Sequence, residues 1–208
     1  MPSAGEILNG LSEISVSWKA FAILWHIYFA VFAIVALSAF RPSNHFVAAA
    51  LVPPLASVGA LAWVGRNPFN GATFCLLSVA LLLVLLAFHT RHVERAPPRW
   101  LVPGLVLAGF GWAYPHFLDS EPWTSRLYAS PLGLIPCPSL SMVLGVTMIY
   151  GGLNSRIWSL ILAIAAIFYG VFGSLYLGVT VDWVLAGGGI AMFGLIFWQA
   201  SGDTARAA

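Results

Sequence analysis

Cys137 lies between two prolines, Pro136 and Pro138, at the point where a polar loop enters an apolar segment. Proline fixes its own φ and has no amide hydrogen, so the pattern leaves few nearby donors and favours an extended chain around the thiol. A backbone opened in this way presents a soft thiolate to Cu(I), zinc or mercury. Three interpretations stay open: a metal-binding or redox thiol, a small apolar filler in a rigid loop, and a disulfide with Cys75.

Other reactive side chains are expected at the same end of the protein. His116 ends the fourth apolar segment, His26 lies about two turns inside the first, and Asp182 begins the last. The candidate ligands for a solute or metal ion are Cys137, His116, His26 and Cys75, with Asp119, Asp182 and Tyr114 expected behind them. Both histidines also have structural interpretations, because a histidine suits a helix C-terminus and a buried one serves as a hydrogen-bond hub. No particular cofactor is indicated.

The composition places these residues in a membrane protein. Of 208 residues, 60% are hydrophobic and 8% are charged, whereas soluble domains have about 45–50% and about 25%. The net charge is +2 and the basic residues are scattered singly, which does not favour a nucleic-acid partner. The chain has the length of one compact helical bundle, so residues 1–208 are expected to form a single transmembrane domain in the lipid bilayer.

Apolar runs separated by polar or Pro/Gly-rich breaks predict an all-α, polytopic bundle of about seven membrane-spanning helices. The predicted spans are 18–40, 46–64, 71–89, 100–117, 139–153, 156–177 and 182–199. The fifth is short, because crossing a bilayer takes roughly 20 residues. It is either extended by residues 131–138 or partly re-entrant, so six crossings are the alternative.

The basic residues predict the orientation. With seven crossings, one side has six of them, Arg41, Arg91, Arg95, Arg99, Arg156 and Arg206, and the other has three, Lys19, Arg66 and Arg126. Cytoplasmic loops are enriched in lysine and arginine. The N-terminus is therefore expected outside, the C-terminus inside, and the Cys137 end outside.

The predicted spans contain no charged residue away from their ends. Carriers driven by ion gradients usually place a carboxylate near the middle of the membrane, so this class is disfavoured. A retinal protein needs a lysine in its last span, and the only lysine here is Lys19. Small residues at intervals of four predict helix-packing faces at Gly104 and Ala108, and at Gly170, Ser174 and Gly178.

One stretch resembles a known family. The segments "YPHFLDSEPW", "GLIPCPS" and "WSLILAIAAIFYGVFGS" are similar to the DUF6064 family of bacterial integral membrane proteins, whose function is unknown. The resemblance covers roughly residues 60–195 and matches Tyr114 and Pro115, then Gly133 with Pro136, Cys137 and Pro138, then Trp158 and Gly173-Ser174, and Asp182. It implies a shared fold and a structural loop formed by Gly133, Pro136 and Pro138, but no activity. Two departures are Ser139 in place of threonine and a missing histidine before Asn67-Pro68.

These observations favour two hypotheses. In the first, a multi-pass protein of the bacterial inner membrane handles a small solute or soft metal ion at an outer-face site around Cys137. In the second, the chain is a non-catalytic accessory subunit of a larger energy-transducing complex, with membrane-protein partners or further copies of itself. A polar pocket at the outer rim would favour the first, and a fully packed apolar rim the second. Enzymatic activity is the less favoured class.

Overall fold

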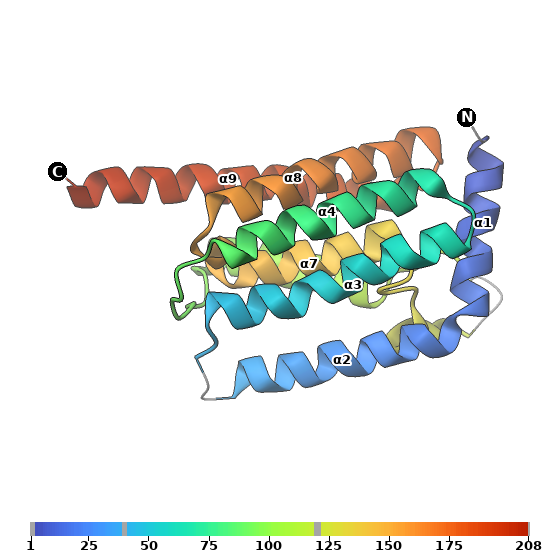
Figure 1. Ribbon diagram of the computed structural model, residues 1–208, viewed down its shortest axis with the longest axis horizontal. Coiled ribbons are helices and arrows are strands. Elements are labelled where there is room, and N and C mark those ends of the chain that lie inside the picture. The colour runs from blue at the N-terminus through green and yellow to red at the C-terminus, as the bar shows by residue number, and fades with distance from the viewer. Residues whose placement is uncertain (1–2, 39–40, 119–121, 208) are drawn as a thin grey trace.

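The computed structural model describes residues 3–38, 41–118 and 122–207, and over these residues it is helical without β-strands (Figure 1). The helices are α1 (Ala4–Ser17), α2 (Lys19–Leu37), α3 (Asn44–Val64), α4 (Pro68–Leu86), α5 (Pro98–Trp112), α6 (Arg126–Ala129), α7 (Pro136–Ile149), α8 (Arg156–Val171) and α9 (Trp183–Ala207). The short turns are η1 (Trp123–Ser125), η2 (Gly151–Asn154), η3 (Phe172–Tyr176) and η4 (Thr180–Asp182).

Within the described residues, four helical segments are long and apolar enough to cross a membrane: Asn44–Val64, Pro68–Leu86, Arg156–Tyr176 and Thr180–Ala200. A fifth is added if α1 and α2, which are bent by 73° relative to each other, form one broken span. The helices α5 and α7 coincide with predicted spans but have only 15 and 14 residues. The all-helical fold with several apolar helices is therefore confirmed, while seven crossings and the orientation stay predictions.

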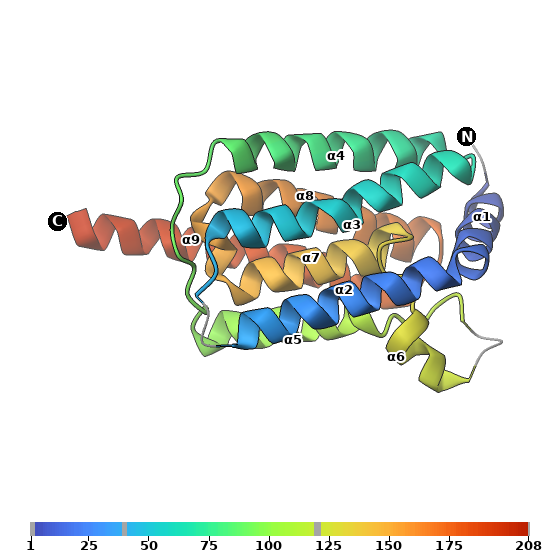
Figure 2. The same cartoon turned by 60° about the horizontal axis from the view of Figure 1, so that its bottom comes forward.

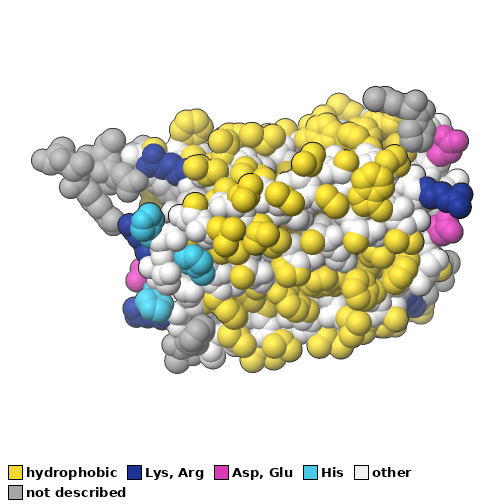
Figure 3. Space-filling view, in the orientation of Figure 1, with side chains coloured by type: hydrophobic (Ala, Val, Ile, Leu, Met, Phe, Trp, Pro, Cys, Tyr) yellow, Lys and Arg dark blue, Asp and Glu magenta, His cyan; other side chains and the backbone are white. Residues whose placement is uncertain are grey.

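The sides of the bundle are apolar and its ends are polar. Figure 3 shows hydrophobic side chains along the length of the visible face and charged side chains of both signs at its two ends, with the histidines at the left end. On α4 the exposed leucines are Leu76, Leu82, Leu83 and Leu86. Contiguous apolar surface of this kind suits contact with lipid.

The helix α7 forms the centre of the bundle and packs against α3, α5, α8 and α9. Twelve of its 14 residues are buried. Its polar side chains are paired, since Ser141 donates to the Leu107 carbonyl (2.8 Å) and Thr147 accepts from the Trp158 indole (3.2 Å). A helix surrounded by protein does not need to match the bilayer thickness, which explains its short length.

Small residues let α5 and α7 approach closely. A Cβ atom on Gly145 would lie 2.5 Å from the Ala108 amide nitrogen, and one on Gly104 would lie 2.9 Å from the Gly145 carbonyl oxygen. The packing face predicted at Gly104 and Ala108 is thus confirmed. The second predicted face holds at Gly170, which contacts Ala186, but Gly178 has φ 73° and open space around its Cα.

The helix α1 was not expected and lies across one end of the bundle (Figure 1). It begins with a capping box, in which Ser3 and Glu6 exchange side-chain and backbone hydrogen bonds. Its apolar side buries Leu11 and Ile14, while Glu6 is exposed. This helix therefore covers the end at which α7 begins.

The helix α2 is attached differently from α7. Long side chains connect it to its neighbours: Trp25 donates to Ser57 (3.2 Å), and Tyr28 donates to the Ala50 carbonyl (2.8 Å). The His26 ring is hydrogen-bonded to the Trp112 carbonyl of α5 (3.0 Å). These contacts hold α2 in place without close backbone approach along its length.

Candidate functional site

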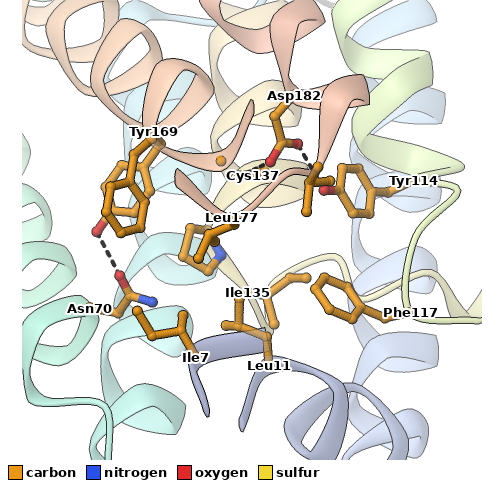
Figure 4. Close-up of a pocket in the computed structure, with 14 residues that line it drawn as sticks. Ile7, Leu11, Asn70, Tyr114, Phe117, Ile135, Cys137, Tyr169, Leu177 and Asp182 are labelled. Atoms are coloured by element: carbon orange, nitrogen blue, oxygen red, sulfur yellow. Dashed lines mark hydrogen bonds between the residues drawn. The ribbon is translucent and has the colours of Figure 1, made fainter. Parts of the chain in front are cut away.

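The thiol of Cys137, the hydroxyl of Tyr114 and the carboxylate of Asp182 meet at the end of the bundle covered by α1 (Figure 4). The Cys137 thiol donates to Asp182 Oδ2 (3.1 Å), and the Tyr114 hydroxyl donates to Asp182 Oδ1 (2.8 Å). Asp182 and Tyr114 are each 1% exposed. Both carboxylate oxygens of Asp182 are thus engaged in a site removed from bulk solvent, where hydrogen bonds are strong and unpaired groups costly.

Cys137 is the second residue of α7. Pro136 begins the helix, and Ile135 before it has extended backbone angles, φ −127° and ψ 161°. Amide hydrogens in a first turn have no intrahelical acceptor, so Pro136 and Pro138 cost no helical hydrogen bond. The expectation that these prolines form an extended structural loop is therefore wrong, because they begin a helix.

The turn before α7 is held by Ser139 and Gly133. The Ser139 hydroxyl accepts from the Gly133 amide (2.9 Å) and donates to the Ile135 carbonyl (2.7 Å). Gly133 has φ 73°, and a side chain there would overlap the Trp25 ring. Gly133 thus forms the predicted loop. Ser139, which stands where the DUF6064 pattern has threonine, is hydrogen-bonded to both Gly133 and Ile135 in this turn. Residues 131–135 do not extend the helix.

Asp182 is positioned by an irregular end of α8. The segment η3 is a π-helical turn, in which the Leu177 amide donates to the Phe172 carbonyl (3.1 Å). The chain then reverses, and the Val179 amide donates to the Gly173 carbonyl (2.9 Å). The Asp182 carboxylate contacts Gly173, where any Cβ atom would overlap it. Single π-turns of this kind are frequent at functional sites.

A small cavity of about 20 Å³ lies beside Cys137 and Asp182. It has room for about one water molecule or one ion. Ile7 and Leu11 of α1 form part of its wall. Across the cavity, the Tyr169 hydroxyl donates to Asn70 Oδ1 (3.0 Å), and the amide nitrogen of Asn70 points inward (Figure 4). The cavity therefore has polar groups from α4, α7, α8 and η4 within an apolar lining.

The predicted site residues are only partly brought together. Cys137, Asp182 and Tyr114 form one hydrogen-bonded group, although Asp182 and Tyr114 were expected behind the ligands rather than in contact with them. His26 is 4% exposed, and its two ring nitrogens face the carbonyls of Ala22 (2.9 Å) and Trp112 (3.0 Å). A neutral ring donates to one of these carbonyls, which agrees with the hydrogen-bond interpretation.

The remaining predicted ligands lie apart from the thiol. The His116 ring packs on Phe117, with centroids 4.3 Å apart, and is not hydrogen-bonded to Cys137 or Asp182. Cys75 and Cys137 are both free, so the disulfide is not formed, and Cys75 is exposed. Asp119 lies outside the described residues.

The described residues contain no group of three or more histidine, cysteine, aspartate and glutamate side chains arranged for a metal ion. A site built from Cys137, His116 and His26 together is accordingly not formed. Cys137 and Asp182 supply two ligand atoms, and the Tyr114 oxygen is a third polar atom beside them. A thiolate with a hard oxygen donor suits an ion of borderline to soft character.

Sequence reasoning missed Asn70, Tyr169 and the covering helix α1. The signal for α1 is the Ser3-to-Glu6 capping-box spacing ahead of the apolar residues Ile7, Leu8 and Leu11. Asn70 and Tyr169 are 99 positions apart, and each is only a lone polar residue in an apolar run. Their pairing depends on how α4 packs on α8.

Comparison with known proteins leaves the site to be interpreted from its own geometry. No family model, no curated protein and no solved structure matches the chain.

Proposed function

We propose that this protein is a multi-pass protein of the bacterial inner membrane that binds a soft metal ion between Cys137 and Asp182. The observation that carries the proposal is the thiol-to-carboxylate hydrogen bond of 3.1 Å at the wall of a small cavity. Ionisable groups buried in membrane proteins are costly and usually serve a function. The polar groups that α4, α7, α8 and η4 contribute to the cavity also support a binding site rather than a fully packed apolar contact surface.

The size of the cavity favours an ion over an organic solute, because about 20 Å³ accommodates about one water-sized particle. A thiol must lose its proton to become a metal ligand. Asp182 Oδ2 already accepts that hydrogen, so it is placed to take the proton from the thiol and pass it to water, which leaves the carboxylate ionised to face the bound ion. Tyr114 holds the other carboxylate oxygen and orients the group.

The proposed orientation places this site on the outer side. Arg41, Arg91, Arg95, Arg99 and Arg156 lie in or beside the α2–α3, α4–α5 and α7–α8 connections. These connections lie at the end opposite α1 (Figure 2). Positive residues mark cytoplasmic loops, which supports seven crossings with the N-terminus outside.

The test is metal binding by the purified protein in detergent under reducing conditions. Wild type, Cys137→Ser and Cys75→Ser are each equilibrated with Cu(I), Zn²⁺ or Hg²⁺, and bound metal is measured by elemental analysis. We expect stoichiometric metal in wild type and in Cys75→Ser, and loss of it in Cys137→Ser. Asp182→Asn keeps the side-chain volume but removes the proton acceptor, so its affinity at neutral pH is expected to fall.

If neither wild type nor Cys75→Ser binds any of the three metals, the metal-site proposal is wrong. Unchanged thermal stability of Cys137→Ser would then leave Pro136-Cys137-Pro138 as a helix start. The accessory-subunit hypothesis would become the leading one, and cross-linking to neighbouring membrane proteins would be the next measurement.

A further inference from the structure

An apolar groove runs along the bundle between α2, α5 and α7, away from the thiol site. Its volume is about 480 Å³, within the range of roughly 300–1,000 Å³ typical of ligand pockets. The residues that line it include Phe29, Phe32, Leu105, Gly109, Trp112 and Met142. The groove exists because α2 is held by long side chains and does not close on α5.

One end of the groove joins a polar pocket of about 590 Å³. Arg95 and Tyr150 line both hollows and therefore mark their junction. The polar pocket is further lined by His92, Glu94, Asn154 and Gln199. Together the two hollows suit an amphiphilic ligand, because the groove has an apolar lining and the adjoining pocket a polar one.

The junction presents the unpaired donors of an arginine. Arg95 is exposed, and among the described residues it forms no ion pair or hydrogen bond. Tyr150 is only 6% exposed, and it lies beside Arg95 in the lining of both hollows. Glu94 is the one acidic side chain in the lining of the pocket. Nearby, Arg99 lies over the Trp198 ring at 4.4 Å, so the positive charges outnumber the negative one.

The wall of the polar pocket is a strained turn. The residues of η2, Gly151 to Asn154, all have positive φ, between 55° and 68°. Two of them, Leu153 and Asn154, are not glycine, and left-handed backbone is sterically unfavourable for a side chain such as that of Leu153. Gln199 of α9 holds the turn by donating to the Gly151 carbonyl (2.6 Å). The pocket is thus held open by a specific contact between α9 and the turn.

We propose that the groove and the pocket together bind one anionic phospholipid, with an acyl chain between α2 and α5 and the phosphate at Arg95 and Tyr150. Arginine binds phosphate with charge-assisted, bidentate hydrogen bonds. Basic pockets between membrane helices on the cytoplasmic side bind anionic head groups, and the proposed orientation puts Arg95 on that side. A soluble phosphate compound would leave the apolar groove unfilled.

The experiment measures binding of phosphatidylglycerol and phosphatidylcholine to the delipidated protein in detergent by native mass spectrometry. We expect wild type to bind phosphatidylglycerol about tenfold more tightly than phosphatidylcholine, because both lipids have a phosphate but the choline group adds a positive charge beside Arg95. Arg95→Gln is expected to abolish this preference while the chain still binds. Arg91→Gln, on the same connection but outside both hollows, is the matched control and should keep it.

A second pair of variants tests the groove. A side chain at Gly109 meets open space, so Gly109→Leu fills the groove without a backbone clash and is expected to weaken both lipids about tenfold or more. Gly187→Leu on α9, where the added side chain also meets open space, should bind as wild type. Thermal unfolding in detergent confirms that all four variants are folded.

Three results would overturn the proposal. Equal affinity for the two lipids in wild type would remove the role of Arg95. If Gly109→Leu binds both lipids as tightly as wild type does, the acyl chain does not lie in the groove between α2 and α5. Displacement of the lipid by millimolar inorganic phosphate would assign the polar pocket to a free anion.

Discussion

The helices α7 and α2 meet their neighbours in opposite ways. On α7, Gly145 brings the backbone against Ala108 and Gly104 of α5. On α2, the contacts are made by the tips of Trp25, His26 and Tyr28. Backbone contact leaves no room between helices, whereas contact through aromatic side chains leaves a groove beside them.

This difference separates the two candidate sites. Close packing around α7 buries Ser139, Ser141 and Thr147 with their partners, and it holds the start of the helix firmly enough to orient a thiol toward Asp182. The loose attachment of α2 instead produces a hollow open to the side. In a membrane, where apolar side chains gain little by leaving lipid, small residues decide which helices can close on one another.

The largest expected effect comes from breaking the close contact. In Gly145→Val the added Cβ would lie 2.5 Å from a backbone nitrogen, so α5 and α7 must separate. We expect a loss of about 3 kcal/mol, equivalent to a fall of roughly 10 °C in the unfolding temperature. Thermal unfolding in detergent measures this change. Gly187→Val, where the side chain meets open space, is the control, and an equal fall in both would refute the packing argument.

A smaller effect is expected where α2 is attached to α5. In His26→Phe an aromatic ring remains, but the hydrogen bond that His26 donates to the Ala22 or the Trp112 carbonyl is lost. Leaving buried acceptors unpaired costs about 1–3 kcal/mol, so the unfolding temperature should fall by roughly 5 °C. The control is His89→Phe, because His89 is exposed and outside this contact. A variant as stable as wild type would mean that aromatic packing alone holds α2.

The smallest effect is expected at the contact between α2 and α3. Ser57→Ala removes the acceptor of the Trp25 indole, 3.2 Å away, at a cost of about 1 kcal/mol. The fall in unfolding temperature should be roughly 3 °C, measured beside Ser38→Ala, whose hydroxyl bonds only its own helix. A loss as large as that of Gly145→Val would show that both helices depend equally on their contacts.

The apolar runs predicted the main helices well, since a run such as residues 71–89 has few alternatives in a chain of this composition. The helix α1 was missed because it is amphipathic and polar on one side. The pairing of Cys137 with Asp182 spans 45 positions and depends on the π-turn of η3, which has no sequence signature. His26 was a candidate ligand because its partners are backbone carbonyls. A sequence does not show which backbone carbonyls a side chain will meet.

The π-turn of η3 limits the insertions and deletions that the segment between Phe172 and Asp182 can accept. An α-helix rotates each successive residue by a constant angle, and a π-turn holds one residue more than that path needs. The direction of the Asp182 side chain therefore depends more on the number of residues between Phe172 and Asp182 than on their types. In a chain built on the same plan, a one-residue gap in this interval would turn the carboxylate away from the thiol, even where both residues were present.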